Sequence, residues 1–424
     1  EPVYSGDEKH LESASEHGLG DAKFWAGHRP WLAPLLHKLA GRDDGKLVRL
    51  QWGMLVLAFL VLGAVVFRLS GGGYRALPCA LLCLGFASTP HVLGWTMVVR
   101  AEASGIAMSV LFLAMLMCTC FSLQDESPRW RLRLVVSIGL VLCGWLLAAS
   151  RDSWAFVLPL AAVLIWLPVP YLYRRGRVHR RGLIQASILA MALVLVAGFQ
   201  ARSAEQGDRW RPCLMNIIFQ RILTGAHLQS DWVEHYGMPD DPVLDSLAGK
   251  WCFSDELAGY RHQPFQSWLS EHGLDVYRRD ILTHPARYAD PVWRGFRAAV
   301  NLDGVEGYQQ EAAHGTGPSR WIQGLFFCNL PAGVAELAVI LCMIVPLAIG
   351  LLHRARGVRA VAWGLLIMGA GLPLHMAVCY LGDAMALIRH SLPVTLTLRL
   401  LMLMNLGLMV MLISGACRDR WTRE

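Results

Sequence analysis

The residues best suited to chemistry in this sequence are charged side chains at the ends of long apolar stretches. Ionisable groups beside membrane hydrocarbon are costly, and they commonly serve binding or proton transfer. Arginine can bind two oxygens of a phosphate or carboxylate at once, and a carboxylate can accept a proton from a reacting hydroxyl. Four clusters combine such residues: Asp7-Glu8, Arg100 with Glu102, Arg151-Asp152, and Asp383 with Arg389 and His390. If these clusters converge, they would form one binding or catalytic site.

The elements that must position these clusters are membrane-spanning helices. Of the 424 residues, 54% are hydrophobic and only 17% are charged, against roughly 25% charged in soluble domains. The apolar residues are bunched into stretches near the ~20 residues that a helix needs to cross a bilayer. Nine stretches qualify or nearly qualify: 47–69, 76–98, 102–123, 133–150, 154–172, 183–200, 332–352, 360–380 and 391–415. This pattern predicts an all-α polytopic membrane protein with about nine transmembrane helices, of which the second is the weakest because Pro90 and His91 interrupt it.

The distribution of arginine predicts the orientation of the chain, because short cytoplasmic loops are enriched in Lys and Arg. If the spans alternate from an external start, the five cytoplasmic segments hold 16 arginines and only four acidic residues. The external segment 201–325 holds 12 basic and 16 acidic residues, a net charge of −4. The overall charge of +7 therefore reflects membrane orientation, and we expect no nucleic-acid partner.

The same frame divides the chain into four regions. Residues 1–46 form a first external loop with a candidate catalytic acid, and 47–200 hold six spans. Residues 201–331 form a small, mostly helical external domain, and 332–424 hold the last three spans and a cytoplasmic tail. Because the external residues 1–46 have no apolar stretch before them, we expect either a further N-terminal helix or a cleaved signal peptide upstream.

The external domain carries aromatic and polar residues that could contact a ligand. Its Trp and Tyr residues, Trp268 among them, suit either a membrane-interface belt or stacking against sugar rings. Asn216 and Arg221 lie on a short amphipathic helix. Cys213 and Cys252 could form a disulfide in an oxidising compartment. No Rossmann, P-loop, HExxH or GxSxG pattern occurs in the sequence, which removes the commonest soluble chemistries.

The opening segment resembles the first external loop of the GT-C superfamily of integral-membrane glycosyltransferases. The resemblance rests on Asp7-Glu8, the amphipathic helix after it, Arg29-Pro30 and Pro34-Leu35-Leu36. Further segments resemble bacterial members of that superfamily: Leu147–Ser153, Gly382-Asp383 with Arg389-His390, Asn216 with Arg221, Gly237-Met238-Pro239, and Trp268–Pro285. Together these short motifs cover most of the chain in order.

The resemblance implies transfer of a sugar from a polyprenyl-phosphate donor to an external protein, glycolipid or polysaccharide, with inversion. Asp7 would act as the base, supported by Glu8 or Glu102. The donor phosphate would be held by Arg151, Arg389 and Arg100, with His390 near them. Residues expected to bind substrate are Glu102, Asp152, Arg29, Asn216, Arg221, Trp268 and Asp383. No cofactor is required, although Asp7, Glu8 and Glu102 could hold a divalent metal.

The expected location is the bacterial inner membrane, with the active site facing the periplasm. Two other classes of function remain open. A transporter or flippase for a lipid or solute would show inverted repeats and charges buried in mid-span, whereas the sequence has no internal repeat and its charges lie at span ends. A non-catalytic assembly factor would use residues 201–325 for docking, and its charged clusters would lie far apart.

Overall fold

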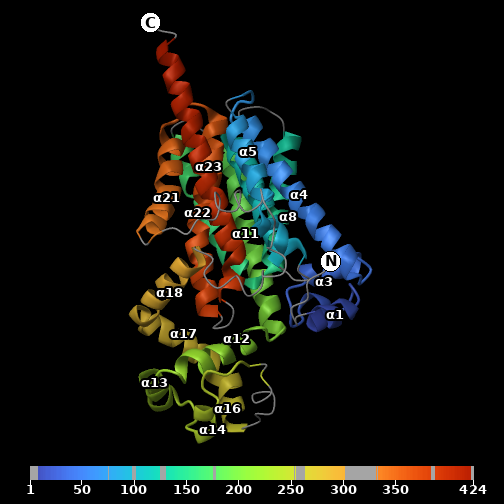
Figure 1. Cartoon of the computed structure of the whole chain (residues 1–424), viewed down its shortest axis with the longest axis vertical. Coiled ribbons are helices and arrows are strands. Elements are labelled where there is room, and N and C mark those ends of the chain that lie inside the picture. Colours follow the sequence, from blue (N-terminus) through green and yellow to red (C-terminus); the bar gives the residue numbers. More distant parts are fainter. Residues whose placement is uncertain are drawn as a thin grey trace.

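The computed structural model describes residues 8–74, 76–97, 102–124, 130–174, 178–252, 254, 263–300, 331, 333–382 and 387–421. All of the regular elements in these ranges are helices (Figure 1). Seven segments are long and apolar enough to cross a membrane. They are α4 (Asp44–Leu69), α7 (Glu102–Gln124), α8 (Trp130–Ser150), Asp152–Arg174, α11 (Arg180–Gln206), α22 (Arg356–Gly382), and Leu392–Ile413 within α23 (Leu387–Trp421). The predicted all-α, multi-pass class is confirmed at this level.

The other two predicted stretches form shorter helices. The second stretch is helical as α5 only over Leu77–Ala87. The Ser88 hydroxyl then donates back to the Leu84 carbonyl and the Thr89 hydroxyl to that of Phe86, before Pro90 starts a new turn. The seventh stretch forms α21 (Val334–Leu352), whose apolar part is shorter than the seven spans.

α7 lies at the centre of the helical bundle. It packs against α4, α8 and α22, and 78% of its apolar window is buried inside the protein. Small residues allow this close packing: Gly144 of α8 faces the Phe112 ring of α7, and Gly105 of α7 faces Ser150. A helix buried on all sides needs apolar residues all round, as this sequence has.

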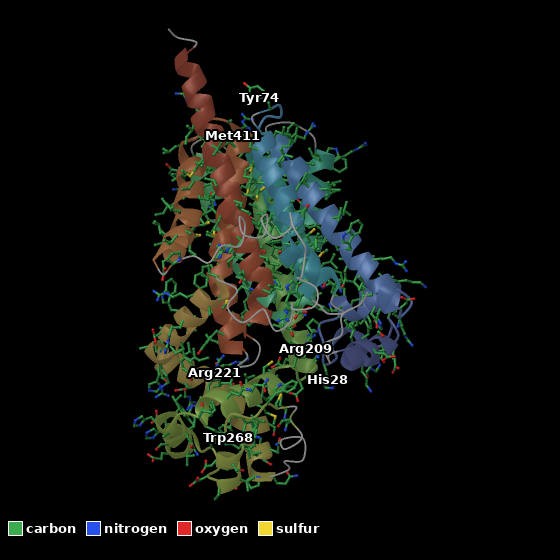
Figure 2. All side chains as sticks on the ribbon, viewed as in Figure 1. His28, Tyr74, Arg209, Arg221, Trp268 and Met411 are labelled. Atoms are coloured by element: carbon green, nitrogen blue, oxygen red, sulfur yellow. The ribbon has the colours of Figure 1, made fainter. Side chains whose placement is uncertain are left out.

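One end of the bundle gathers the segments that carry the arginine-rich loops, and we call it the arginine-rich end. The Arg359 guanidinium donates from Nε to Oε1 of Gln124 over 2.9 Å, which joins the start of α22 to the end of α7. Gly357 lies so close to Leu69 that a Cβ on it would be 1.8 Å from the Leu69 carbonyl oxygen. Tyr74 and Met411 lie toward this end (Figure 2).

The opposite end, which we call the domain end, carries two groups of short helices (Figure 1). The first group is α1 (Glu8–Glu16), α2 (Ala22–Trp25) and α3 (Leu32–Leu39). The second contains α12 (Trp210–Ile217), α13 (Ala226–Tyr236), α14 (Pro242–Ser246), α16 (Gln263–Trp268), α17 (Leu274–Thr283) and α18 (Pro285–Val300), with π-helical turns at Ile218–Ile222 and Leu269–Gly273. The helices from α12 to α17 have a hydrophobic core separate from that of the bundle, whereas Phe296 and Val300 of α18 belong to the bundle core.

The two shorter helices α5 and α21 lie on parts of the chain that cross between the two ends of the bundle. α4 reaches the arginine-rich end at Leu69, yet α7 begins again at the domain end with Glu102. The return is made by α5, α6 (Pro90–Leu93) and the 3-10 turn η1 (Gly94–Met97) together. α21 makes a similar passage from the domain, where Glu336 pairs with Arg297 of α18. Both shorter helices therefore occupy legs that join the two ends.

One helix boundary differs from the sequence-based expectation. α11 continues to Gln206, beyond the predicted end at residue 200, because the last turns pack against the first loop instead of lipid. The possible disulfide between Cys213 and Cys252 is not formed. The backbone N–H of Cys252 instead donates to the Asn216 side chain.

Candidate functional site

A buried ion pair joins two of the predicted charged clusters at the domain end. Nη2 of Arg151 donates to Oε1 of Glu102 over 2.7 Å, and the two side chains are only 16% and 3% exposed. Glu102 is the first residue of α7, while Arg151 adopts an extended conformation (φ −157°) between α8 and η2 (Asp152–Phe156). The helix break at Arg151 thus brings α8 and α7 together through their charges.

A second ion pair is formed by Asp152, the neighbour of Arg151. Its carboxylate lies 3.3 Å from Nε of Arg209 and accepts a 2.8 Å hydrogen bond from Gln200 of α11. Asp208 has a left-handed backbone (φ 51°), which is uncommon outside glycine. This turn ends α11 and places Arg209 beside Asp152. Burial lowers the pKa of the Arg209 guanidinium and the Asp152 carboxylate opposes that effect.

Several hydrogen-bond donors in or beside these two pairs are buried without a partner within the described part of the chain. They are Nε of Arg151, Nη1 of Arg209 and the indole Nε1 of Trp154. Buried polar groups are nearly always satisfied in proteins, so each exception needs an explanation such as water or a ligand. Arginine N–H groups bind phosphate and carboxylate oxygens most strongly. The cluster can therefore accept an anionic group.

α22 forms the neighbouring wall of the site. His375 is fully buried, its Nε2 lies 2.7 Å from the Ser153 hydroxyl, and its ring stacks on Trp154 with centroids 4.0 Å apart. α23 approaches from the other side, where the Pro393 ring lies 3.6 Å from the position of a Cβ on Gly105. The first turn of α23 contains Arg389 and His390, so its backbone starts at this end of the bundle.

The first loop is docked onto the same region by the end of α11. The Ser203 hydroxyl donates to the Trp25 carbonyl over 2.6 Å and accepts a 2.9 Å hydrogen bond from Arg209. His28 lies 3.1 Å from the Gly207 carbonyl, and Figure 2 shows His28 close to Arg209. A continuous chain of contacts therefore runs from the first loop through Ser203 and Arg209 to Asp152.

Four other predicted residues are described but lie outside this cluster. Arg29 is half-buried in the first loop. Asn216 accepts the Cys252 amide, and Trp268 is 6% exposed in the domain core, where it donates to the Tyr236 carbonyl. Arg221 lies over the Tyr380 ring, 3.9 Å from its centroid, and donates to the Tyr380 carbonyl. Arg221 therefore attaches the domain to the end of α22.

The remaining predicted residues are outside what the structure describes. Asp7, Arg100 and Asp383 fall in segments that are not described. Glu8, Arg389 and His390 are placed by their helices, but their side chains are not described. Among the described residues, no group of three His, Cys, Asp or Glu side chains lies close enough to hold a metal ion.

Sequence analysis missed three residues of the cluster, namely Gln200, Arg209 and His375. His375 carries a recognisable signal, since it is an ionisable residue inside the predicted span 360–380, whereas the four predicted clusters lie at span ends. Arg209 has no such signal, because its partner Asp152 is far away in the sequence.

Comparison of the chain with protein families, curated proteins and solved structures finds no match.

Proposed function

We propose that this protein is a membrane glycosyltransferase that moves a sugar from a polyprenyl-phosphate donor to an acceptor at the domain end, with inversion. The observation that carries the proposal is the pair of buried arginines, Arg151 and Arg209. Each is held by a carboxylate, and each has an N–H group without a partner among the residues that the structure describes. These arginines lie where an apolar bundle meets a polar domain. A lipid-linked phosphate has this same division between an apolar tail and an anionic head.

The two ion pairs suit a phosphate site for an energetic reason. An isolated buried guanidinium would be costly, and the carboxylates of Glu102 and Asp152 offset that cost while they fix its orientation. Each guanidinium has five N–H donors in a planar fork, so a carboxylate partner leaves others available to the phosphate oxygens. No nucleotide pocket is needed, because the membrane itself holds the tail of the donor.

The reaction is a single displacement. The hydroxyl oxygen of the acceptor attacks the anomeric carbon of the sugar as a carboxylate base, assigned to Asp7 by the GT-C resemblance, takes the hydroxyl proton. The bond between the anomeric carbon and the phosphate oxygen breaks, and polyprenyl phosphate leaves with the electron pair. Arg151 and Arg209 stabilise the negative charge that develops on the phosphate. One displacement from the opposite face inverts the anomeric configuration.

The test is transfer from a radiolabelled polyprenyl-phosphate sugar by the purified full chain in lipid. Asp7→Asn, Arg151→Gln and Arg209→Gln should each lower transfer by at least 100-fold, within the range found for removal of one transition-state donor or general base. Arg278→Gln is the matched control, because Arg278 is 62% exposed in the domain. Full activity of Asp7→Asn would refute the proposal, as would equal losses in Arg151→Gln and the control.

A strain from which this protein is deleted can identify the acceptor and the sugar to be used in this assay. Mass spectrometry of its surface glycans and envelope proteins should show loss of one sugar from one class of molecule. An unchanged glycan profile together with loss of lipid or solute transport would favour the transporter class instead. An unchanged profile with loss of an envelope complex would favour the assembly factor.

A further inference from the structure

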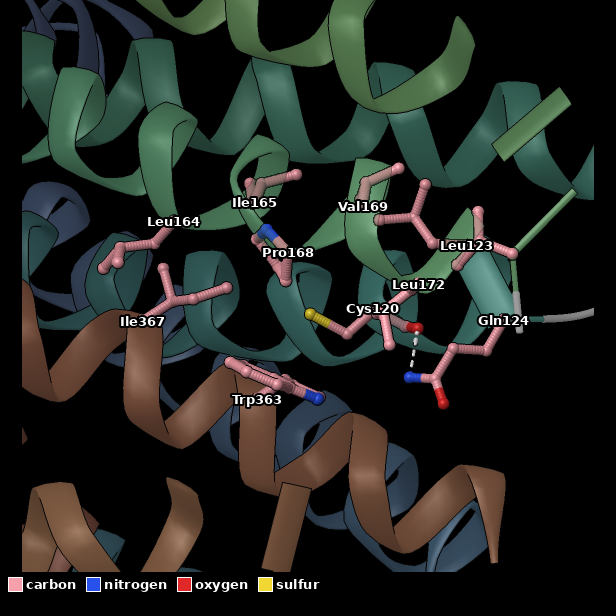
Figure 3. Close-up of a pocket in the computed structure, with 11 residues that line it drawn as sticks. Cys120, Leu123, Gln124, Leu164, Ile165, Pro168, Val169, Leu172, Trp363 and Ile367 are labelled. Atoms are coloured by element: carbon pink, nitrogen blue, oxygen red, sulfur yellow. Dashed lines mark hydrogen bonds between the residues drawn. The ribbon is translucent and has the colours of Figure 1, made fainter. Parts of the chain in front are cut away.

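An apolar groove lies at the arginine-rich end, away from the candidate site. It is shallow and partly open to the surroundings, and it lies between the end of α7, the helices α9 (Val157–Trp166) and α10 (Pro168–Arg174), and α22. Figure 3 shows Cys120, Pro168 and Trp363 facing one another across it. Its polar contribution comes mainly from Gln124, whose amide donates to the Cys120 carbonyl and accepts from Arg359. Because the Gln124 amide is engaged in these bonds, the lining that the groove presents to an occupant is mainly apolar.

The walls of this groove belong to candidate membrane spans, so hydrocarbon surrounds it in a bilayer. It lies at the end of those spans, since Gln124 ends α7 and Leu172 is two residues from the end of α10 (Pro168–Arg174). Apolar lining at this depth fits an acyl chain better than a polar solute or a peptide, whose polar groups would lose their hydrogen bonds there.

Exposed arginines lie close in sequence to residues that line the groove. Arg174 follows the lining residue Leu172 by two positions, while Arg180 and Arg181 follow the lining residue Val178 by two and three. All three side chains are exposed. The acidic residues predicted at this end are few: Asp125 and Glu126, which follow Gln124 in sequence, are not described, and Asp419 lies in the last turns of α23.

We infer that this groove is a binding site for an anionic membrane phospholipid, which nothing in the proposed transfer reaction requires. One acyl chain occupies the space beside Cys120 and Trp363. The phosphate contacts Arg174, Arg180 and Arg181, because anionic headgroups are attracted to basic segments at the membrane surface. A basic loop alone would attract the headgroup, whereas the neighbouring apolar groove would also bind an acyl chain of the same lipid.

Native mass spectrometry of the purified full chain tests the inference, with dioleoyl phosphatidylglycerol and dioleoyl phosphatidylcholine as probes. The wild type should retain one phosphatidylglycerol with at least a tenfold preference over phosphatidylcholine. The triple variant Arg174→Gln, Arg180→Gln, Arg181→Gln should lose this preference. Cys120→Phe, which fills the groove, should reduce retention of both lipids, whereas Cys120→Ser, which keeps its volume, should not.

A matched triple variant separates a site from diffuse charge. Arg68→Gln, Arg131→Gln and Arg418→Gln remove the same number of charges from other predicted cytoplasmic segments and should leave the preference intact. Equal loss in both triple variants would overturn the inference, as would equal retention of the two lipids by the wild type. If Cys120→Phe does not fold, shown by aggregation on gel filtration, the comparison of the two triple variants still decides the question.

Discussion

The ion pair between Glu102 and Arg151 is the interaction at the candidate site with the clearest energetic consequence. Removal of one partner of a buried pair leaves an uncompensated charge and costs about 3–5 kcal/mol, and less where some solvent reaches it. Because Arg151 is 16% exposed, we expect Glu102→Gln to lower the free energy of unfolding by about 2 kcal/mol. Reversible unfolding in mixed micelles measures this change.

The exposed pair Asp275–Arg278 supplies the comparison, since its side chains are 84% and 62% exposed. Asp275→Asn should change the free energy of unfolding by less than about 0.5 kcal/mol. The double variant Glu102→Gln, Arg151→Gln should recover part of the loss, because both charges are then gone. Equal effects of Glu102→Gln and Asp275→Asn would show that the buried pair contributes nothing special.

Gly207 is where the first loop meets the bundle most closely. A Cβ at this position would lie 2.3 Å from the Gly27 carbonyl oxygen and 2.6 Å from that of Ala26. Since both atoms are backbone, Gly207→Ala must push the first loop away, at a cost of about 1–3 kcal/mol. Limited proteolysis should cut residues 17–30 at least tenfold faster, and the melting temperature should fall.

Gly198→Ala is the control for this substitution. Gly198 lies in the same helix, and a Cβ there would meet nothing within 4 Å. Alanine also favours helix over glycine by about 1 kcal/mol, so this variant should be as stable as the wild type or more so. Unchanged proteolysis in Gly207→Ala would show that the contact between the first loop and α11 is not tight in the membrane.

At the scale of elements, the helices α13, α17 and α18 of the domain are joined through one buried carboxylate. The Asp280 side chain is fully buried and accepts hydrogen bonds from Trp232, Tyr288 and Arg287. Burial alone would raise the pKa of Asp280, but the hydrogen bonds from Tyr288 and Trp232 and the Arg287 charge together hold that pKa below its usual value of 3.8. The ionised form therefore stabilises the fold.

The depressed pKa predicts the direction of the pH dependence. As the pH falls below 3.8, the Asp280 carboxylate is protonated in the unfolded chain before it is protonated in the folded protein. The stabilisation by ionised Asp280 is therefore complete at neutral pH and declines as the pH falls below 3.8. Asp280→Asn should therefore lower the melting temperature of the full chain at pH 7. The difference in melting temperature between this variant and the wild type should become smaller toward pH 2.5. Asp275→Asn, at an 84% exposed site, should leave the melting temperature nearly unchanged at both pH values. A pH-independent gap would contradict this assignment.

The sequence predicts these elements better than it predicts their contacts. Seven of nine apolar stretches form helices of spanning length, since hydrophobic burial over a fixed bilayer thickness leaves a strong local signal. The interruption at Pro90 was also predictable from local chemistry. The charged residues Glu102, Arg151 and Asp152 stood out for the same local reason. Arg209 did not, because its pairing with Asp152 depends on how α11 packs against η2, and no local pattern encodes that contact.

At the scale of the whole molecule, the two ends of the bundle differ in charge in a way that predicts its orientation. α22 starts beside Gln124 at the arginine-rich end and finishes against Arg221 at the domain end. The first residues described and the end of α23 lie at opposite ends (Figure 1), which requires an odd number of passages. Among the described residues, the seven candidate spans satisfy this requirement, and so do the nine predicted passages in which α5 and α21 form the shorter legs.

Reporter fusions in a bacterial host test this orientation. Lys and Arg in short loops keep those loops in the cytoplasm, so green fluorescent protein fused after Glu424 should fluoresce and alkaline phosphatase fused there should be inactive. Alkaline phosphatase fused after Gly249, within the domain, should be active. The opposite pattern would place the domain and the Arg151–Arg209 cluster inside the cell. A donor and acceptor outside could then never meet these residues, so the reversed orientation would refute the proposed reaction even if every residue-level prediction held.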